Sequence, residues 1–232
     1  LKLFRNGFST GHGYLGEPNS IISYSALACI AIQANQNEMH GGQSIPNFDY
    51  CMAPGVAKTY RKEFRRQLTN CLEFRFGVSP EKAKEISARI KAEEDPAICL
   101  DGREDTRIYL RRILDGVIPE SEIDAASDLV CDTAFEETDR STYQAMEAFI
   151  HNLNTMKSRA GAQVPFSSIN YGTDTSSEAR MVMRNILLAT DAGLGNGETP
   201  IFPVQIFKVK EGVNYNEDDP NYDLFKLAIK TS

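Results

Sequence analysis

The residues best suited to chemistry lie close together near the beginning of the chain, between positions 6 and 50. A glycine-rich segment over residues 7–16 presents His12, and an apolar run over residues 25–33 holds Cys29 at its centre. Glycine permits a close approach between backbone and ligand. A buried thiol is a poor nucleophile because burial raises its pKa, but it can donate a hydrogen atom or an electron in one-electron chemistry.

Plainer interpretations of the same residues stay open. The glycine-rich segment also fits a surface turn, and a lone buried cysteine is usually a small apolar packing residue. The run over residues 25–33 fits a strand buried on both faces, although its pattern alone does not distinguish that strand from a turn of buried helix. After a turn at residues 40–46, Asn47 and Asp49 either orient a hydroxylated ligand or satisfy nearby backbone groups.

The middle of the chain, over residues 56–158, is charged and helical in character. Apolar residues recur every four positions from Val56 and predict one long helix that ends at Gly77. Ser79 and Pro80 predict the start of a second helix, as N-cap and first-turn residue. Three further helices are predicted over residues 106–115, 119–135 and 139–157.

Basic side chains recur among these predicted helices. They form solvated helix faces or, where several of them converge, a patch that binds a triphosphate. The residues concerned are Arg61, Lys62, Arg65, Arg66, Arg103, Arg107, Arg111 and Arg112.

The last third of the chain alternates between strand and helix patterns. Residues 158–172 predict a turn that leads into a short strand, and the capping-box spacing that begins at Thr175 predicts a helix. Alternating apolar residues over 200–210 predict another strand, and residues 222–230 another helix. This order implies a parallel sheet, with the helical middle as an insertion or flanking layer in an α/β domain.

The composition excludes several classes of function. A net charge of −7 over 232 residues does not provide the basic surface that nucleic-acid binding requires. Five cysteines without a CxxC pair give neither a disulfide framework nor zinc-site spacing, which indicates a reducing cytoplasm. No apolar run is long enough to cross a membrane, and GxSxG and P-loop motifs are absent. Because the chain starts at Leu1 and stops within a helical pattern, we expect a fragment.

Four long blocks carry a resemblance to a known family. They are NGFSTGHGYL, SALACIAIQANQNEMHGGQSIPNFDYCMAP, MKSRAGAQVPFSSINYGTDTS and NILLATDAGLGNGETPIFPVQIFKVKEGVNYNEDDPNYDLFKLA. In this order they closely resemble the anaerobic (class III) ribonucleoside-triphosphate reductases, which are glycyl-radical enzymes. The resemblance implies part of a ten-stranded α/β barrel with a helical insertion layer. It divides the chain into residues 1–55 (first loop and strand), 56–157 (helical dimer and effector region) and 158–232 (further barrel strands and helices).

The resemblance also implies a mechanism and a set of site residues. In the family, a thiyl radical abstracts the ribose 3′ hydrogen, the 2′ hydroxyl leaves as water, and a reductant returns electrons. The implied catalytic residues are Cys29 and His12. Cys29 matches the cysteine of the first barrel strand, which takes part in the reduction, and His12 matches a loop beside the substrate. The implied substrate-binding residues are Ser9, Thr10, Gly11, Ser158, Arg159, Ser167 and Ser168. The implied effector-binding residues are Arg65 and Arg66.

Other parts of the expected enzyme belong beyond residue 232. These are the thiyl cysteine, the glycyl-radical loop and a four-cysteine zinc site, so we expect no metal site and no turnover from this chain alone. The expected partners are a ribonucleoside triphosphate, ATP and deoxynucleotide effectors, formate or a redoxin, a radical S-adenosylmethionine activase and a second copy of the chain, but no nucleic acid or membrane. Two alternatives are a glycyl-radical lyase of pyruvate formate-lyase type and a non-catalytic nucleotide-binding and dimerising module.

Overall fold

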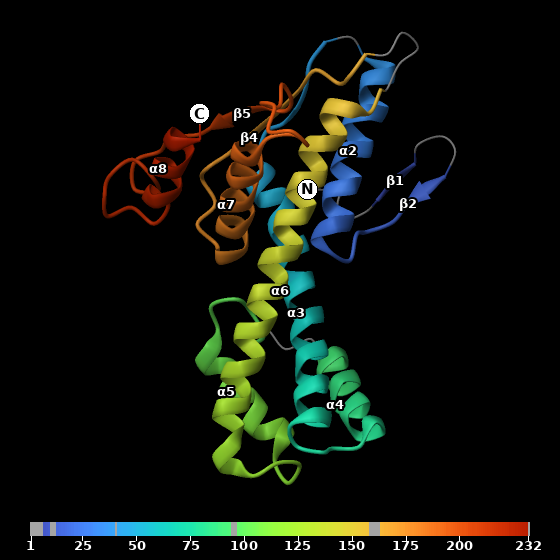
Figure 1. Ribbon diagram of the computed structural model, residues 1–232, viewed down its shortest axis with the longest axis vertical. Coiled ribbons are helices and arrows are strands. Elements are labelled where there is room, and N and C mark those ends of the chain that lie inside the picture. The colour runs from blue at the N-terminus through green and yellow to red at the C-terminus, as the bar shows by residue number, and fades with distance from the viewer. Residues whose placement is uncertain (1–6, 10–12, 40, 94–96, 158–162, 232) are drawn as a thin grey trace. The chain divides into compact units, whose positions relative to one another are not determined.

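The computed structural model describes residues 7–9, 13–39, 41–93, 97–157 and 163–231. These residues form two compact units (Figure 1). The first unit consists of Leu1–Val56 and Ser141–Ser232, and the second of Ala57–Arg140. The described chain is a helix-rich α/β structure. None of its described helices is long and apolar enough to cross a membrane.

The first unit contains a parallel sheet, as the sequence predicts. Its strands are β3 (Gln43–Ile45), β4 (Ser167–Tyr171) and β5 (Val204–Phe207), in the order β3-β4-β5, and both pairs are parallel. The short strand β3 was not predicted, because it lies inside residues 40–46, where the sequence predicts a turn. Two further strands, β1 (Phe8–Ser9) and β2 (Tyr14–Leu15), form a separate antiparallel pair.

The side chains of β4 alternate between two environments. Ser167, Ile169 and Tyr171 are buried, whereas Ser168 and Asn170 are partly exposed. Paired residues of a parallel sheet share one face, and the register aligns Ser168 with Ser44 of β3 and with Val204 of β5. We call the exposed side of the sheet the open face; it carries Ser44, Ser168, Asn170, Val204 and Ile206.

Two predicted helices follow the strands in this unit. Helix α7 (Ser177–Ala192) comes after β4, and its N-cap is Ser176, whose side chain accepts a hydrogen bond from the backbone N–H of Ala179. The capping-box prediction had placed the cap one residue earlier, at Thr175. Helix α8 (Tyr222–Lys230) comes after β5, where the sequence predicts it.

The predicted strand over residues 25–33 is wrong. These residues lie within helix α2 (Ile21–Glu38), which is capped by Ser20, and the side chain of Ser20 accepts from the N–H of Ser23. The prediction depends on nine residues that lie inside the helix and are almost all apolar. Such a run does not show the helical alternation of apolar and polar positions. Over the full helix, burial recurs at a helical spacing from Ile21 to Ile32.

Four helices lie wholly or partly in the second unit. They are α3 (Phe48–Phe74), α4 (Pro80–Glu93), α5 (Arg103–Leu114) and α6 (Glu120–Thr155). The predicted helices are confirmed, but α3 begins eight residues before Val56, and α6 is one helix where two were predicted. No glycine or proline lies between residues 135 and 139 to stop α6. Thr138 bonds within the helix, with its Oγ1 donating to the Ala134 carbonyl.

Among the described residues the sheet has three parallel strands, and no ten-stranded barrel is seen. The α/β class predicted from the sequence is therefore confirmed, while the barrel remains an interpretation drawn from the resemblance.

Candidate functional site

The carboxyl ends of β3, β4 and β5 lie along one edge of the sheet because the strands are parallel. We call this the carboxyl edge. In open α/β sheets, ligands bind outside the carboxyl ends of the strands. The connections that leave β3, β4 and β5 at this edge lead to α3, α7 and α8 respectively.

A buried carboxylate joins two of these connections. Asp49, in the first turn of α3, has an exposed fraction of 0%. Its Oδ2 accepts hydrogen bonds from the backbone N–H groups of Gly172, Thr173 and Asp174, at 2.9, 3.0 and 3.1 Å. Its Oδ1 accepts from the N–H of Tyr50 at 3.0 Å. The loop that follows β4 is thereby tied to the beginning of α3.

Two buried carboxamides hold the other side of the same loop. The Nδ2 of Asn214 donates to the carbonyl of Gly172 at 2.8 Å and to that of Lys208 at 2.9 Å. The Nδ2 of Asn221 donates to the carbonyl of Asp174 at 2.8 Å. Gly172 has φ +122°, and a Cβ there would lie 2.7 Å from the Lys208 carbonyl oxygen, so a side chain at this position would be strained.

Lys208 supplies a positive charge at the carboxyl edge. Its Nζ donates to Asn47 Oδ1 at 2.7 Å and to the carbonyl of Pro46 at 3.0 Å. Both acceptors belong to the connection after β3, whereas Lys208 directly follows β5. The side chain therefore links the ends of the two outer strands of the sheet.

The open face carries hydrogen-bonding groups that lead toward this edge. The Oγ of Ser44 donates to Asn170 Oδ1 at 3.3 Å, across the β3-β4 pair. Ser168 lies on this face as well, but Ser167, its neighbour in the predicted substrate set, is 0% exposed on the opposite face. Among the described residues, the Oγ of Ser167 has no hydrogen-bond partner. The two serines therefore cannot line one common surface.

Cys29 lies on a helix, so the strand position expected for it is wrong. Its side chain is 3% exposed within α2, and burial raises the pKa of the thiol to about 12. A hydrogen bond with Asn152 of α6 acts in the opposite direction and lowers this pKa, with a smaller effect. A role for Cys29 in the reduction now rests on the resemblance alone.

Several predicted site residues lie outside the described residues. They are Thr10, Gly11, His12, Ser158 and Arg159, whose proposed roles stay predictions. Ser9 is described; it lies in β1, where it pairs with Tyr14 of β2 and is exposed.

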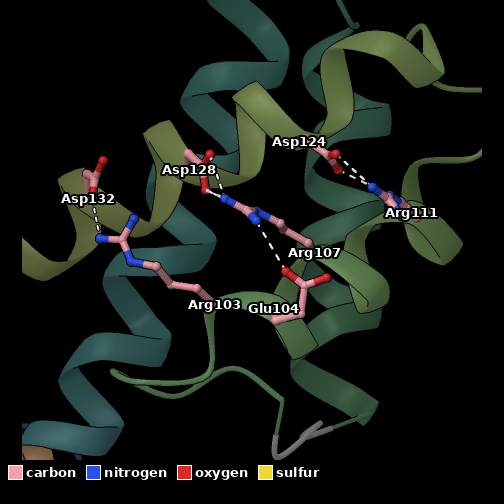
Figure 2. A network of polar contacts seen from close by, with 7 residues as sticks. All are labelled: Arg103, Glu104, Arg107, Arg111, Asp124, Asp128 and Asp132. Carbon is pink, nitrogen blue, oxygen red and sulfur yellow. Dashed lines mark hydrogen bonds and ion pairs between the residues drawn. The ribbon is translucent and has the colours of Figure 1, made fainter.

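Most of the arginines in the predicted triphosphate patch are paired with carboxylates. Arg103, Arg107 and Arg111 of α5 bond in turn to Asp132, Asp128 and Asp124 of α6 (Figure 2). We call this set the arginine ladder. Because each guanidinium meets a carboxylate of a facing helix, the three do not converge on one anion site.

Arg65 and Arg66 differ in whether they pair with a carboxylate. Arg66 pairs with Glu63 at 2.6 Å and with Glu137 at 3.3 Å. Arg65 has no carboxylate partner within the described part of the chain. Burial, followed by the neighbouring charge of Arg61, lowers the pKa of Arg65. Of the two predicted effector residues, Arg66 has carboxylate partners and Arg65 has none among the residues that the structure describes.

The sequence was compared with families of known proteins. A family model described as anaerobic ribonucleoside-triphosphate reductase matches residues 1–232. The chain belongs to this family. It is 28% identical over 98% of its length to the anaerobic ribonucleoside-triphosphate reductase of Enterobacteria phage T4, and 26% identical to those of Salmonella typhimurium and Escherichia coli. The matched part is 29% of the phage reductase and 24% of each bacterial reductase, so the chain spans about a quarter of these relatives.

The sequence did not predict the contacts of Asn214 and Asn221, because its pattern there indicates only a polar loop. Asp49 does satisfy one nearby backbone group, the N–H of Tyr50, but its other three partners, the N–H groups of residues 172–174, are distant in sequence and were not predicted. Among the residues the structure describes, no group of three histidine, cysteine, aspartate or glutamate side chains could hold a metal ion.

Proposed function

We propose that this chain forms part of the catalytic domain of an anaerobic ribonucleoside-triphosphate reductase. The whole enzyme would convert ribonucleoside triphosphates to 2′-deoxyribonucleoside triphosphates by thiyl and glycyl radical chemistry, for DNA synthesis. The observation that carries the proposal is the match of the family model to all 232 residues. The parallel sheet, with three connections at its carboxyl edge, supports it.

The sheet is suited to be part of a barrel wall. Among the described residues, β3 and β5 each pair on one side only, which leaves two strand edges for further strands. Val204 and Ile206 are each 44% exposed on the open face, which suits a surface that other segments cover. We propose that the open face points into the barrel, where radical intermediates are kept from water.

The open face and the carboxyl edge provide groups that suit the proposed substrate. Ser44, Ser168 and Asn170 can donate and accept hydrogen bonds, as ribose hydroxyls require. The ammonium group of Lys208 can attract a triphosphate. We propose that these four side chains orient the ribose and phosphates, while the loop over residues 172–174 closes one side of the site.

The radical and reductant chemistry is proposed to come from outside this chain. A glycyl radical installed by a radical S-adenosylmethionine activase would supply the oxidising equivalent, and a zinc site would belong to the C-terminal part of the enzyme. Formate or a redoxin would return electrons. We also propose regulation by ATP and deoxynucleotides, assembly as a homodimer through the helical segment, and a cytoplasmic location.

A product assay tests the proposed activity. The full-length protein is activated without oxygen by its radical S-adenosylmethionine partner and incubated with a ribonucleoside triphosphate and formate, or with a reduced redoxin. Deoxynucleoside triphosphates separated by chromatography are the expected product. Cleavage of pyruvate in the presence of coenzyme A, without deoxynucleotide formation, would indicate a lyase instead. Effector binding without either reaction would indicate a nucleotide-binding module.

A further inference from the structure

We propose that Asp49 is a positioning residue for the substrate site: its buried carboxylate fixes the loop over residues 172–174 against the start of α3. This inference rests on the proposed function, because it assigns the loop to the substrate site of the reductase. It adds a residue that acts through the backbone rather than by touching the substrate.

The three N–H groups on Asp49 form a concave arrangement of the kind that binds anions. Gly172, Thr173 and Asp174 all donate to the same oxygen, Oδ2, within 3.1 Å. Successive backbone N–H groups of this kind form a nest that commonly binds phosphate. Here the protein's own carboxylate fills the nest, and the N-terminal end of α3 further favours its negative charge. The nest is therefore not available to a substrate phosphate.

Asp49 connects segments that are distant in sequence and adjacent at the site. The residue lies 123 positions before Gly172. One segment follows β3, which carries Ser44, and the other follows β4, which carries Asn170. These two side chains are bonded across the open face at 3.3 Å. By tying the two connections together, Asp49 sets the alignment of the strand ends on which those groups lie.

The loop is held from the opposite side as well, so it has one defined position. Asn221 donates to the Asp174 carbonyl, and its own Oδ1 accepts from Nη1 of Arg180 at 2.8 Å. Arg180 in turn pairs with Asp223 at 2.8 Å. Asn214 and Asn221 hold the carbonyls while Asp49 holds the N–H groups. Removal of the carboxylate therefore leaves the buried N–H of Gly172 and the part-buried N–H groups of Thr173 and Asp174 without this acceptor, and it frees one side of the loop.

The test is substrate binding to the full-length, unactivated protein, measured by equilibrium dialysis with a ribonucleoside triphosphate. The variants are Asp49→Ala and Asp49→Asn. We expect Asp49→Ala to raise the Kd about tenfold. The carboxamide of Asp49→Asn can still accept from the loop but places an N–H₂ group toward the N–H of Tyr50, so we expect an increase of roughly threefold.

Two controls separate positioning from a general loss of stability. Glu198→Ala removes a carboxylate that accepts from the N–H of Asn196 in the turn before β5, at the opposite edge of the sheet. Ile186→Val removes a buried methyl group of α7. Both should leave the Kd within about twofold of the parent protein, even where the melting temperature falls.

Each outcome tests either the positioning role of Asp49 or the proposed reductase function. A Kd unchanged in both Asp49 variants, or in Asp49→Asn if Asp49→Ala does not fold, overturns the positioning role. A Kd raised equally by Ile186→Val overturns it as well, because the effect would then follow stability. Failure of the parent protein to bind any ribonucleoside triphosphate would count against the proposed function and not against the geometry at Asp49.

Discussion

Arg107 of α5 and Asp128 of α6 form an ion pair in which Nη2 of the arginine donates to both carboxylate oxygens, at 2.7 Å from Oδ1 and 2.9 Å from Oδ2. It is the central rung of the arginine ladder (Figure 2). On each helix the paired residues are four positions apart. Residue numbers rise along α5 while those of the partners on α6 fall, as in two antiparallel helices. The arginine side chains therefore stabilise a helix pair in the second unit.

The first prediction concerns the strength of this ladder. Side chains of the Arg107 and Asp128 pair are 32% and 40% exposed, so solvent screens their attraction. In a double-mutant cycle with Arg107→Ala and Asp128→Ala, we expect a small favourable coupling in the free energy of unfolding, measured by urea denaturation. The coupling should fall markedly in 0.5 M salt, on the order of half.

The exposed pair between Lys82 and Glu85 of α4 is the matched control for the ladder. Its coupling should be smaller, at roughly 0.3 kcal/mol. A ladder coupling that does not respond to salt would contradict the prediction, because it would show that the contact is not mainly electrostatic.

The second prediction separates the two proposed effector residues. Arg65→Ala should raise the Kd of the full-length enzyme for a deoxynucleoside triphosphate effector about tenfold, since an uncompensated guanidinium can bind phosphate strongly. Arg66→Ala should change it less than about twofold, because Glu63 and Glu137 already occupy this guanidinium. Equal effects of the two substitutions on effector binding would show that ion pairing in α3 does not decide which arginine binds.

The third prediction concerns Cys29. The resemblance implies a role for this thiol in the reduction, so in the full-length enzyme we expect Cys29→Ala to fold and bind a ribonucleoside triphosphate but to form no deoxynucleotide. With a pKa of about 12, the native thiol should also resist iodoacetamide at pH 8. A variant that keeps deoxynucleotide formation and loses only about 1 kcal/mol of stability would instead show that Cys29 is a packing residue.

The fourth prediction is a pH dependence in the second unit. Hydrogen bonds from Arg89 and then Tyr109 lower the pKa of Glu93 below its usual value of 4.5. A carboxyl group with a lower pKa in the folded state stabilises the fold above its unfolded pKa, and that contribution is lost as the pH falls through the folded value. Thermal stability should therefore decrease below about pH 4.5.

Glu93→Gln tests whether this carboxyl group contributes to the acid sensitivity. The variant should be less stable than the parent at pH 7, and the difference between them should narrow as the pH falls below the usual range of the glutamate pKa. Glu81, in the first turn of the same helix, serves as the control position. A difference that stays constant between pH 7 and pH 3 would contradict the assignment.

Local sequence features determined much of the fold. The four-residue apolar spacing predicted α3, the Ser79 and Pro80 pair predicted the start of α4, and the alternation of β5 was visible within a few residues. The parallel arrangement followed from the order of strands and helices. These features depend on neighbours within one or two turns, so a window of sequence contains the information. Helix α2 was predicted as a strand for two reasons. Apolar residues lie on all sides of this helix, and its N-cap residue, Ser20, lies outside the run over residues 25–33 on which the prediction rests.

Only the tertiary structure decided what the functional side chains contact. Nothing near Asp49 in sequence shows that its partners are the N–H groups that follow β4. Similarly, the resemblance implies a substrate-binding role for both adjacent residues Ser167 and Ser168, but the pleat of β4 places their side chains on opposite faces. The arginines of α5 look like a phosphate patch until α6 brings its aspartates beside them. Sequence thus determined most of the elements and the family, while contacts between distant residues determined which polar groups remain free to bind a ligand.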